Sequence, residues 1–166
     1  MPALRRTQQG ATLVELVITI VIISVAIAGV VGAFSLIAGR SADPLNETRA
    51  IKLAQLYMDE ILARKYDEQT PQGGVPKYSG ACTIGPEGAE SRSTFDDVDD
   101  YDGLTGAPSS ATGASLNGYQ GFSISIRVSC AGVEVGLASS DAKRIDLQIA
   151  APGGHSFAFS AYRANF

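Results

Sequence analysis

The sequence predicts an α+β protein in which a long N-terminal helix packs on a C-terminal antiparallel β-sheet. Residues 11–66 repeat apolar side chains at helical spacing, almost without charge in the first half and with an amphipathic pattern in the second. Residues 121–166 alternate apolar and polar side chains with a period of two, as half-buried strands do. Residues 67–120 are punctuated by Gly and Pro, so we expect irregular structure there.

The first helix, predicted over residues 11–39, is long and apolar enough to span a membrane. From Leu16 to Ala38 there is no Asp, Glu, Lys or Arg, and a helix of this length crosses a hydrocarbon core of about 30 Å. Arg5 and Arg6 precede the apolar run. By the positive-inside rule they keep the N-terminus in the cytoplasm and direct the remaining chain to the other side of the inner membrane.

Glu15 is a carboxylate at the edge of this apolar helix. An ionised side chain in hydrocarbon costs a few kcal/mol or more without a partner, so such a group is a candidate functional residue. The alternative interpretation is that Glu15 extends to the lipid headgroups from the helix N-terminus, where the helix dipole also favours it.

The N-terminal motif carries a resemblance to a known family. A short basic leader that ends in Gly10, followed by Ala11, Thr12–Glu15 and a long apolar run, resembles the class III signal of type IV pilins and type II secretion pseudopilins. The resemblance implies the pilin fold and a leader of residues 1–10, which prepilin peptidase removes after Gly10 before it methylates the new N-terminal amine of Ala11. It also implies that Glu15 pairs with that amine of a neighbouring subunit during filament assembly.

The sequence also contains a second possible processing site. Ala26-Ile27-Ala28, followed by Gly29, fits the A-x-A pattern of ordinary signal peptidase, which would leave a soluble mature protein. The apolar run continues well past this point, and Glu15 would lie inside the apolar part of the signal. Both features favour cleavage after Gly10, and N-terminal sequencing separates the two.

Residues 40–66 predict an amphipathic helix. Apolar side chains recur at helical spacing and the intervening positions are largely charged or polar, so we expect one face to cover the sheet. Pro44 either kinks a helix that is continuous with the first or begins a new one. The apolar positions are Ile51, Ala54, Met58, Ile61 and Leu62.

Strands are expected in the last third of the chain. The clearest alternation runs from Phe122 to Cys130 and places Cys130 on the inward face. We expect further strands at 133–137, 145–149 and 157–162.

Cys82 and Cys130 are the only cysteines. An even pair in an exported domain is most simply a disulfide, here closing a loop of about 49 residues. Neither cysteine belongs to a CxxC motif, which disfavours a redox or zinc site.

An acidic cluster is the candidate metal site. Counted back from Gly103, Asp100 and Asp102 match the third and fifth ligand positions of an EF-hand loop. Val98 and Ser109 occupy the first and twelfth positions, so the EF-hand pattern fails. Two interpretations remain, a solvated acidic loop and a calcium site. The candidate ligands are Asp97, Asp99, Asp100 and Asp102.

Three further segments, 39–45, 94–104 and 161–166, resemble minor pilins of the mannose-sensitive hemagglutinin (MSHA) pilus, a cell-adhesion pilus. This resemblance implies a low-abundance subunit of an extracellular pilus in a Gram-negative bacterium. Its partners would be other pilin subunits, prepilin peptidase, the inner-membrane assembly platform and, before assembly, membrane lipid. The alternative within the superfamily is a minor pseudopilin of type II secretion.

Enzymes and nucleic-acid binders are disfavoured. The single histidine, His155, follows a Gly-Gly turn, and the sequence has neither GxSxG nor a P-loop. Removal of the leader leaves 11 basic and 17 acidic side chains, a poor surface for DNA. We therefore expect no enzymatic activity, no nucleic-acid partner and no cofactor, with calcium at the acidic cluster as the alternative. The less favoured alternative is a membrane-anchored or secreted periplasmic enzyme or binding domain.

Overall fold

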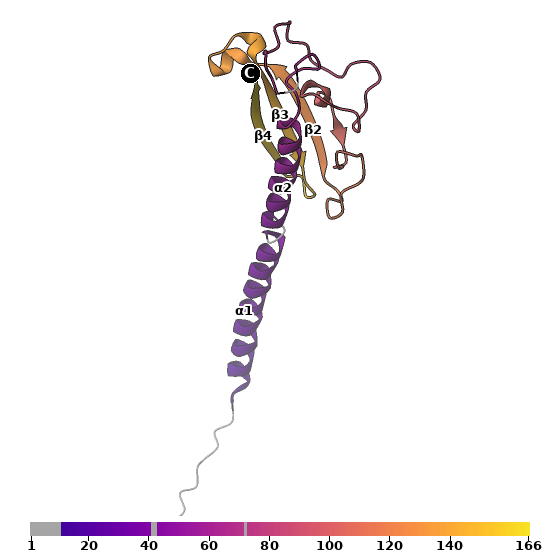
Figure 1. The fold of residues 1–166 in the computed structure, drawn as a ribbon. Helices are drawn as coiled ribbons and strands as arrows, with labels where there is room; N and C mark the ends of the chain where they lie inside the picture. The colour runs from indigo at the N-terminus through magenta and orange to yellow at the C-terminus, as the bar shows by residue number, and fades with distance from the viewer. Residues whose placement is uncertain (1–10, 41–42, 72) are drawn as a thin grey trace, which may run out of the picture. The chain divides into compact units, whose positions relative to one another are not determined.

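The computed structural model describes residues 11–40, 43–71 and 73–166. They fall into two compact units, one that ends at Pro44 and one that comprises Leu45–Phe166 (Figure 1). The first contains helix α1, Leu13–Arg40. Helix α2, Asp43–Leu62, supplies the N-terminal part of the second unit, which also holds the β-sheet.

Helix α1 is exposed and apolar along Leu13–Ile37, a length and composition that suffice to cross a membrane. Its few hydroxyl groups bond within the helix, because apolar surroundings offer them no other acceptor. The side chains of Thr19, Ser24 and Ser35 each donate to the carbonyl four residues earlier, at 2.6, 2.7 and 3.0 Å. The helix can therefore lie in lipid with these groups satisfied.

Helix α2 covers one face of the sheet, and the predicted apolar face is confirmed except at Ile51, which is 42% exposed. Its buried side chains pack against those of the strands in a single core. The helix ends at Leu62, four residues before the predicted end. The reason is tertiary: Lys65 pairs with Asp97 in a parallel β-bridge, and the buried Tyr66 hydroxyl donates to the Ser140 carbonyl at 2.6 Å. The helical core residues are Ala50, Leu53, Ala54, Tyr57 and Ile61.

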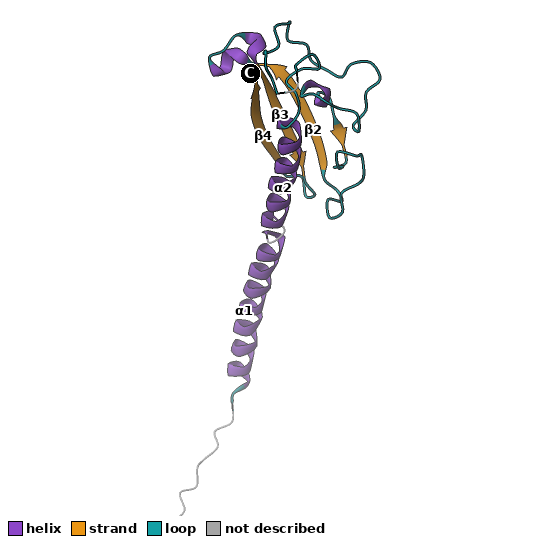
Figure 2. Ribbon diagram, viewed as in Figure 1, coloured by secondary structure: helices purple, strands orange, loops and turns teal. Residues whose placement is uncertain are grey.

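The sheet is antiparallel throughout, with strand order β1-β2-β3-β4 (Figure 2). Its strands are β1 (Thr105–Gly106), β2 (Ser123–Cys130), β3 (Ala142–Ala150) and β4 (Ser156–Ala164). Alternate residues of β2 and β3 are buried, which confirms the period of two found in the sequence. The structure is thus α+β, with a long apolar helix followed by an antiparallel four-stranded sheet.

The strand predicted at 133–137 is wrong. The β2–β3 connection instead contains two 3₁₀ helices, η2 (Gly132–Val135) and η3 (Ser139–Asp141), and Val133 is 73% exposed. The chain turns back on itself here: the Leu137 N–H donates to the Gly132 carbonyl at 2.8 Å. A Cβ at Gly132 would lie 1.7 Å from the Ala138 carbonyl oxygen, so only glycine permits this close approach.

Cys82 and Cys130 form the predicted disulfide. The expectation that Cys130 is buried is wrong, since the residue is exposed. It is the last residue of β2 and lies beyond the apolar core, whose β2 members end at Val128. The disulfide therefore attaches the irregular region to the end of the strand, outside the core.

We expect loss of this disulfide to lower the free energy of unfolding by about 4 kcal/mol, the chain-entropy value for a closed loop of this length. The variant is Cys82→Ser with Cys130→Ser in the full chain in detergent, followed by urea unfolding monitored by circular dichroism. Reductant should lower the stability of the wild type and leave the double variant unchanged. Equal stability of the oxidised wild type and the double variant would contradict the expectation.

Candidate functional site

The predicted processing site lies at the start of α1. Gly10 and the leader arginines lie outside the described residues, whereas Ala11 is exposed just before the helix. Thr12 caps the helix, because its hydroxyl oxygen accepts the Glu15 backbone N–H at 3.3 Å. The helix therefore begins immediately after the predicted new N-terminus.

The Glu15 side chain is exposed on the first turn of α1. Within the described part of the chain, its carboxylate has neither a hydrogen bond nor an ion pair, in contrast to the hydroxyl groups of the same helix. A carboxylate on an apolar helix needs a partner to lower the cost of its charge in lipid. The exposed position leaves it accessible to a group from another chain.

A second candidate site is a cluster of buried carboxylates around the 3₁₀ helix η1, Asp99–Tyr101. Asp97 and Asp99 are fully buried and Asp100 is 1% exposed, so the prediction of a solvated acidic loop is wrong for these residues. Backbone N–H groups hold the carboxylates in place. Asp97 Oδ1 accepts from Asp99 at 2.9 Å, and Asp100 Oδ2 accepts from Asp96 at 2.8 Å and Asp97 at 3.1 Å.

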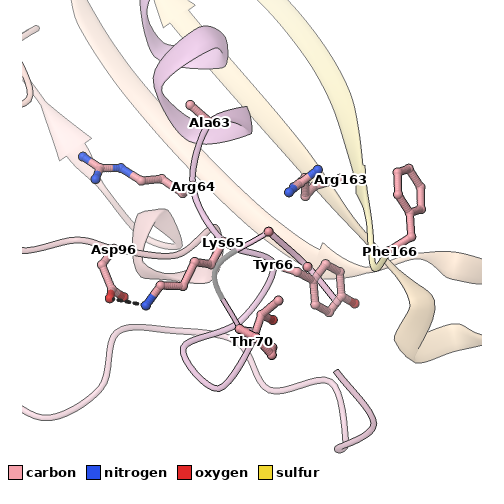
Figure 3. Close-up of a pocket in the computed structure, with 11 residues that line it drawn as sticks. Ala63, Arg64, Lys65, Tyr66, Thr70, Asp96, Arg163 and Phe166 are labelled. Carbon is pink, nitrogen blue, oxygen red and sulfur yellow. Dashed lines mark hydrogen bonds and ion pairs between the residues drawn. The ribbon is translucent and has the colours of Figure 1, made fainter. Parts of the chain in front are cut away.

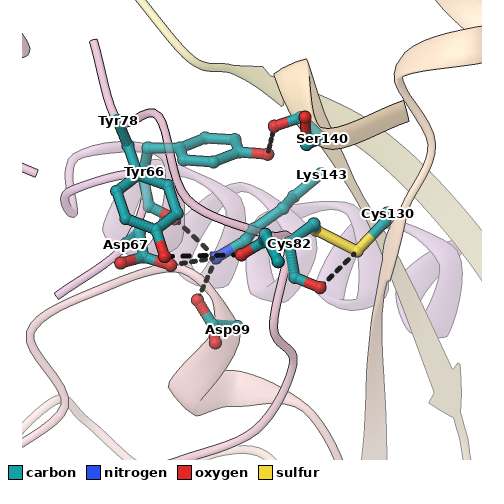
Figure 4. Close-up of a disulfide and its surroundings, with 9 residues drawn as sticks. Tyr66, Asp67, Tyr78, Cys82, Asp99, Cys130, Ser140 and Lys143 are labelled. Atoms are coloured by element: carbon teal, nitrogen blue, oxygen red, sulfur yellow. Dashed lines mark hydrogen bonds and ion pairs between the residues drawn. A yellow bond between two sulfur atoms is a disulfide. The ribbon is translucent and has the colours of Figure 1, made fainter. Parts of the chain in front are cut away.

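Lys143 of β3 partly neutralises this cluster. Its fully buried ammonium forms an ion pair with Asp99, donates to the Tyr66 carbonyl at 2.8 Å and lies 3.7 Å from Asp67 Oδ2. Figure 4 shows the ammonium directed at these groups, beside the Cys82–Cys130 disulfide. Burial raises the pKa of Tyr66 to about 12, with neighbouring carboxylates adding to the effect.

Sequence reasoning did not identify Lys143, although a signal was present. It lies two residues before Ile145 and therefore in phase with the inward-facing side chains of β3. A lysine on the apolar face of a strand is seldom fully buried unless it is paired. The position of Lys143 in the alternation of β3 therefore predicts that an acidic group pairs with it in the core.

The structure does not place Asp102 with the other predicted ligands. Its Oδ1 instead accepts the backbone N–H of Val128 in β2 at 2.8 Å. Two glutamates that sequence reasoning missed take its place. Carboxylate oxygens of Glu87, Asp97 and Asp99 lie within 4.8 Å of one another, and so do those of Glu87, Glu90 and Asp100. We call Glu87, Glu90, Asp97, Asp99 and Asp100 the acidic centre.

Crowding in the acidic centre changes the acidity of its members. Burial, together with the negative charge of Asp99, raises the pKa of Asp97 to about 8. Interaction with the neighbouring Asp100 carboxyl group, together with burial, raises the pKa of Glu90 to about 7. Crowding and burial therefore favour the protonated forms of Asp97 and Glu90.

Arg92 connects the segment before η1 to helix α2 through side-chain contacts. Its Nη2 donates to Glu60 Oε2 at 2.7 Å, and its guanidinium carbon lies 5.3 Å from the Tyr57 ring centre and 5.1 Å from that of Tyr101. Burial raises the pKa of Glu60, but hydrogen bonds from Arg92 and Tyr101 outweigh it, so this pKa lies below its usual value. This contact positions η1, and hence the acidic centre, against the helix.

A cavity with a volume of about 750 Å³ lies among the described residues and is shown in Figure 3. Lys65 and Asp96 point toward one another there and form an ion pair of 2.9 Å. Arg64 Nε donates to the Tyr101 hydroxyl at 3.3 Å, so two of the three cationic side chains that line the cavity have partners. We assign no ligand to this cavity. Its lining also includes Ala63, Tyr66, Thr70, Pro71, Gly73, Gly74, Arg163 and Phe166.

Comparison with known proteins finds a match in the N-terminal segment. Residues 5–31 match the family described as the prokaryotic N-terminal methylation motif. No curated protein and no solved structure matches the chain. The motif supports the class of type IV pilins and pseudopilins that prepilin peptidase processes, and the apolar helix fits membrane anchoring. The α+β architecture is consistent with the pilin fold.

Proposed function

We propose that this chain is a minor type IV pilin of the MSHA type, similar to the minor pilin MshD, which is incorporated into a pilus or initiates one. The observation that carries the proposal is the methylation motif over residues 5–31, which overlaps the start of the exposed apolar helix α1. The chain would be inserted in the inner membrane with its sheet domain in the periplasm, and would then pass into the extracellular filament.

Glu15 would act as the assembly residue. Cleavage after Gly10 creates an ammonium group at Ala11, and this charge and the Glu15 carboxylate are each costly in lipid. A pair formed between neighbouring subunits removes both costs. The exposed apolar surface of α1 would then pack against the same helix of other pilins.

The assignment to the MSHA type rests on the resemblance of segments 39–45, 94–104 and 161–166. Most of the middle segment folds into the region around η1, where Asp97, Asp99 and Asp100 are buried. Its acidic residues therefore take part in the packing of the domain. A minor pseudopilin of type II secretion would share the motif and the fold. The two functions are distinguished by whether loss of the protein impairs pilus assembly or type II secretion.

We also propose that the chain is not an enzyme. The residues assigned to roles serve processing, assembly and packing, and the sequence has neither the GxSxG motif nor a P-loop. Assays of the purified protein for hydrolase activity test this statement, since turnover unaffected by loss of Glu15 would indicate a membrane-anchored enzyme.

Processing after Gly10 gives a direct test. We expect Gly10→Phe to block cleavage by prepilin peptidase, because the enzyme must admit the backbone next to the scissile bond with almost no side chain. The measurement is the intact mass of the protein co-expressed with the peptidase. The wild type should lose residues 1–10 and gain one methyl group, whereas the variant should keep its full length.

Gly29→Ala is the matched control. It replaces the glycine that follows the alternative cleavage site. Apart from the adjoining backbone of its own helix, a Cβ there would meet no atom within 4 Å, so normal processing is expected. Normal processing of Gly10→Phe, or a wild-type protein that begins at Gly29, would refute the proposal.

A further inference from the structure

We propose that the acidic centre binds calcium. The proposal concerns the domain formed by Leu45–Phe166 and does not depend on the processing of the N-terminus. Its starting point is a set of buried carboxylate oxygens that have no partner. Asp97 Oδ2, Asp99 Oδ2 and Asp100 Oδ1 make no hydrogen bond within the described residues, although their side chains are 99–100% buried.

An unpaired buried oxygen raises the free energy of the folded state, because the group has lost its hydrogen bonds to water and has formed none within the protein. Each of these three carboxylates has its other oxygen engaged: those of Asp97 and Asp100 accept backbone N–H groups, and that of Asp99 meets Lys143. The unpaired oxygens are therefore the ones left for a ligand. Glu90 adds a fourth, its buried Oε2.

The spacing of the oxygens suits a bound ion. Calcium binds oxygen at about 2.3–2.6 Å, so two oxygens on one ion lie within about 5 Å of each other. The two groups of three carboxylates meet this limit, with all ligand atoms of a group within 4.8 Å. Glu87 belongs to both groups, so the two groups adjoin one another.

The chemistry of the donors selects the ion. All five residues offer carboxylate oxygens and none offers nitrogen or sulfur, which favours a hard cation over zinc. Magnesium demands octahedral geometry and gives up its water reluctantly, whereas calcium accepts irregular sets of six to eight oxygens. A site assembled from a 3₁₀ helix and an irregular segment, and largely closed to water, fits calcium better.

The charge balance also favours a divalent cation. Lys143 supplies one positive charge, on the Oδ1 side of Asp99, to a centre that contains five carboxyl groups. Glu87 is accessible to solvent and provides the route by which an ion can enter. A bound ion would tie the segment that contains Glu87 and Glu90 to η1, inside the loop closed by the disulfide.

Terbium luminescence tests the proposal in the full chain purified in detergent. Terbium replaces calcium in oxygen sites, and since the chain contains no Trp, its emission must be excited through tyrosine. Tyr101 directly follows Asp100 in η1 and is the expected donor. The wild type should show saturable emission that calcium abolishes and that magnesium at the same concentration reduces less.

Glu87→Gln is the decisive variant, because this accessible side chain can lose its charge without disturbing the core. We expect calcium to bind at least about tenfold more weakly, since even changes to groups around a metal's ligands cost 10–100-fold in affinity. Glu68→Gln, an exposed acid of the same irregular region, is the control and should bind as the wild type does. Circular dichroism confirms that both variants are folded.

Melting temperature supplies a second readout, because a ligand that binds only the folded state raises it with concentration. Calcium should raise the melting temperature of the wild type and of Glu68→Gln, and raise that of Glu87→Gln less. No terbium emission and no thermal shift at millimolar calcium would overturn the proposal. Equal calcium affinity in Glu87→Gln and the wild type would overturn it as well.

Discussion

Replacement of Glu15 by Val is expected to abolish incorporation into filaments while leaving membrane insertion intact or improved. The variant removes a charge from the hydrocarbon edge, but it leaves the ammonium of a neighbouring subunit without a partner, at a cost of a few kcal/mol or more. The start of α1 should persist, because Thr12 bonds to the backbone N–H of residue 15 and not to its side chain. The measurements are membrane fractionation and immunoblots of sheared pili.

Thr19→Val is the matched control for this experiment. It also removes a polar side chain from the first turns of α1, but one whose hydroxyl already bonds to the Glu15 carbonyl within the same helix. Incorporation should therefore be close to that of the wild type. Equal incorporation of Glu15→Val and the wild type would mean that the carboxylate only reaches the lipid headgroups.

Replacement of Lys143 by Met is expected to destabilise the sheet domain by about 3–5 kcal/mol, the usual cost of removing one partner of a buried ion pair. The variant keeps much of the apolar length of the side chain, but it leaves Asp99 buried without its counter-charge and the Tyr66 carbonyl without its donor. Thermal unfolding of the full chain in detergent with chelator present should show a melting temperature lower by roughly 10 °C or more.

Lys77→Met provides the matched control. Lys77 forms an ion pair of 2.9 Å with Asp141, but 56% of its side chain is exposed, so its removal should cost at most about 1 kcal/mol. Addition of Asp99→Asn to Lys143→Met should recover part of the lost stability, because it removes the unpaired charge. Similar melting temperatures for Lys143→Met and Lys77→Met would show that the buried pair contributes little.

Local patterns in the sequence were enough to predict the elements that depend on periodicity. The apolar run that forms α1, the amphipathic face of α2 and the alternation of β2 and β3 each reflect contact with one uniform environment, either lipid or a single core. Residues 133–137 also alternate between apolar and other side chains, but Gly132 and Gly136 allow the chain to form a tight turn there. Two or three alternating residues therefore do not establish a strand beside such glycines.

The acidic residues show what local patterns cannot predict. Five aspartates within seven residues are typical of a solvated loop, because sequence alone does not reveal what covers them. Three of them, Asp97, Asp99 and Asp100, are buried beside Lys143 from β3, and Arg92 holds the preceding segment against α2. Lys143 lies more than 40 residues from Asp99 along the chain, and Arg92 lies 32 residues from its partner Glu60.

The sequence by itself determined the N-terminal motif, the membrane-length helix, the α+β class and the pairing of Cys82 with Cys130. Each depends on a short motif, on a local period or on the count of one residue type. Only the tertiary structure decided that Asp97, Asp99 and Asp100 are buried, that Asp102 bonds to β2 instead, and that Glu87 and Glu90 complete the acidic centre. The physical reason is that burial and charge pairing depend on distances between segments remote in the chain, which no local pattern encodes.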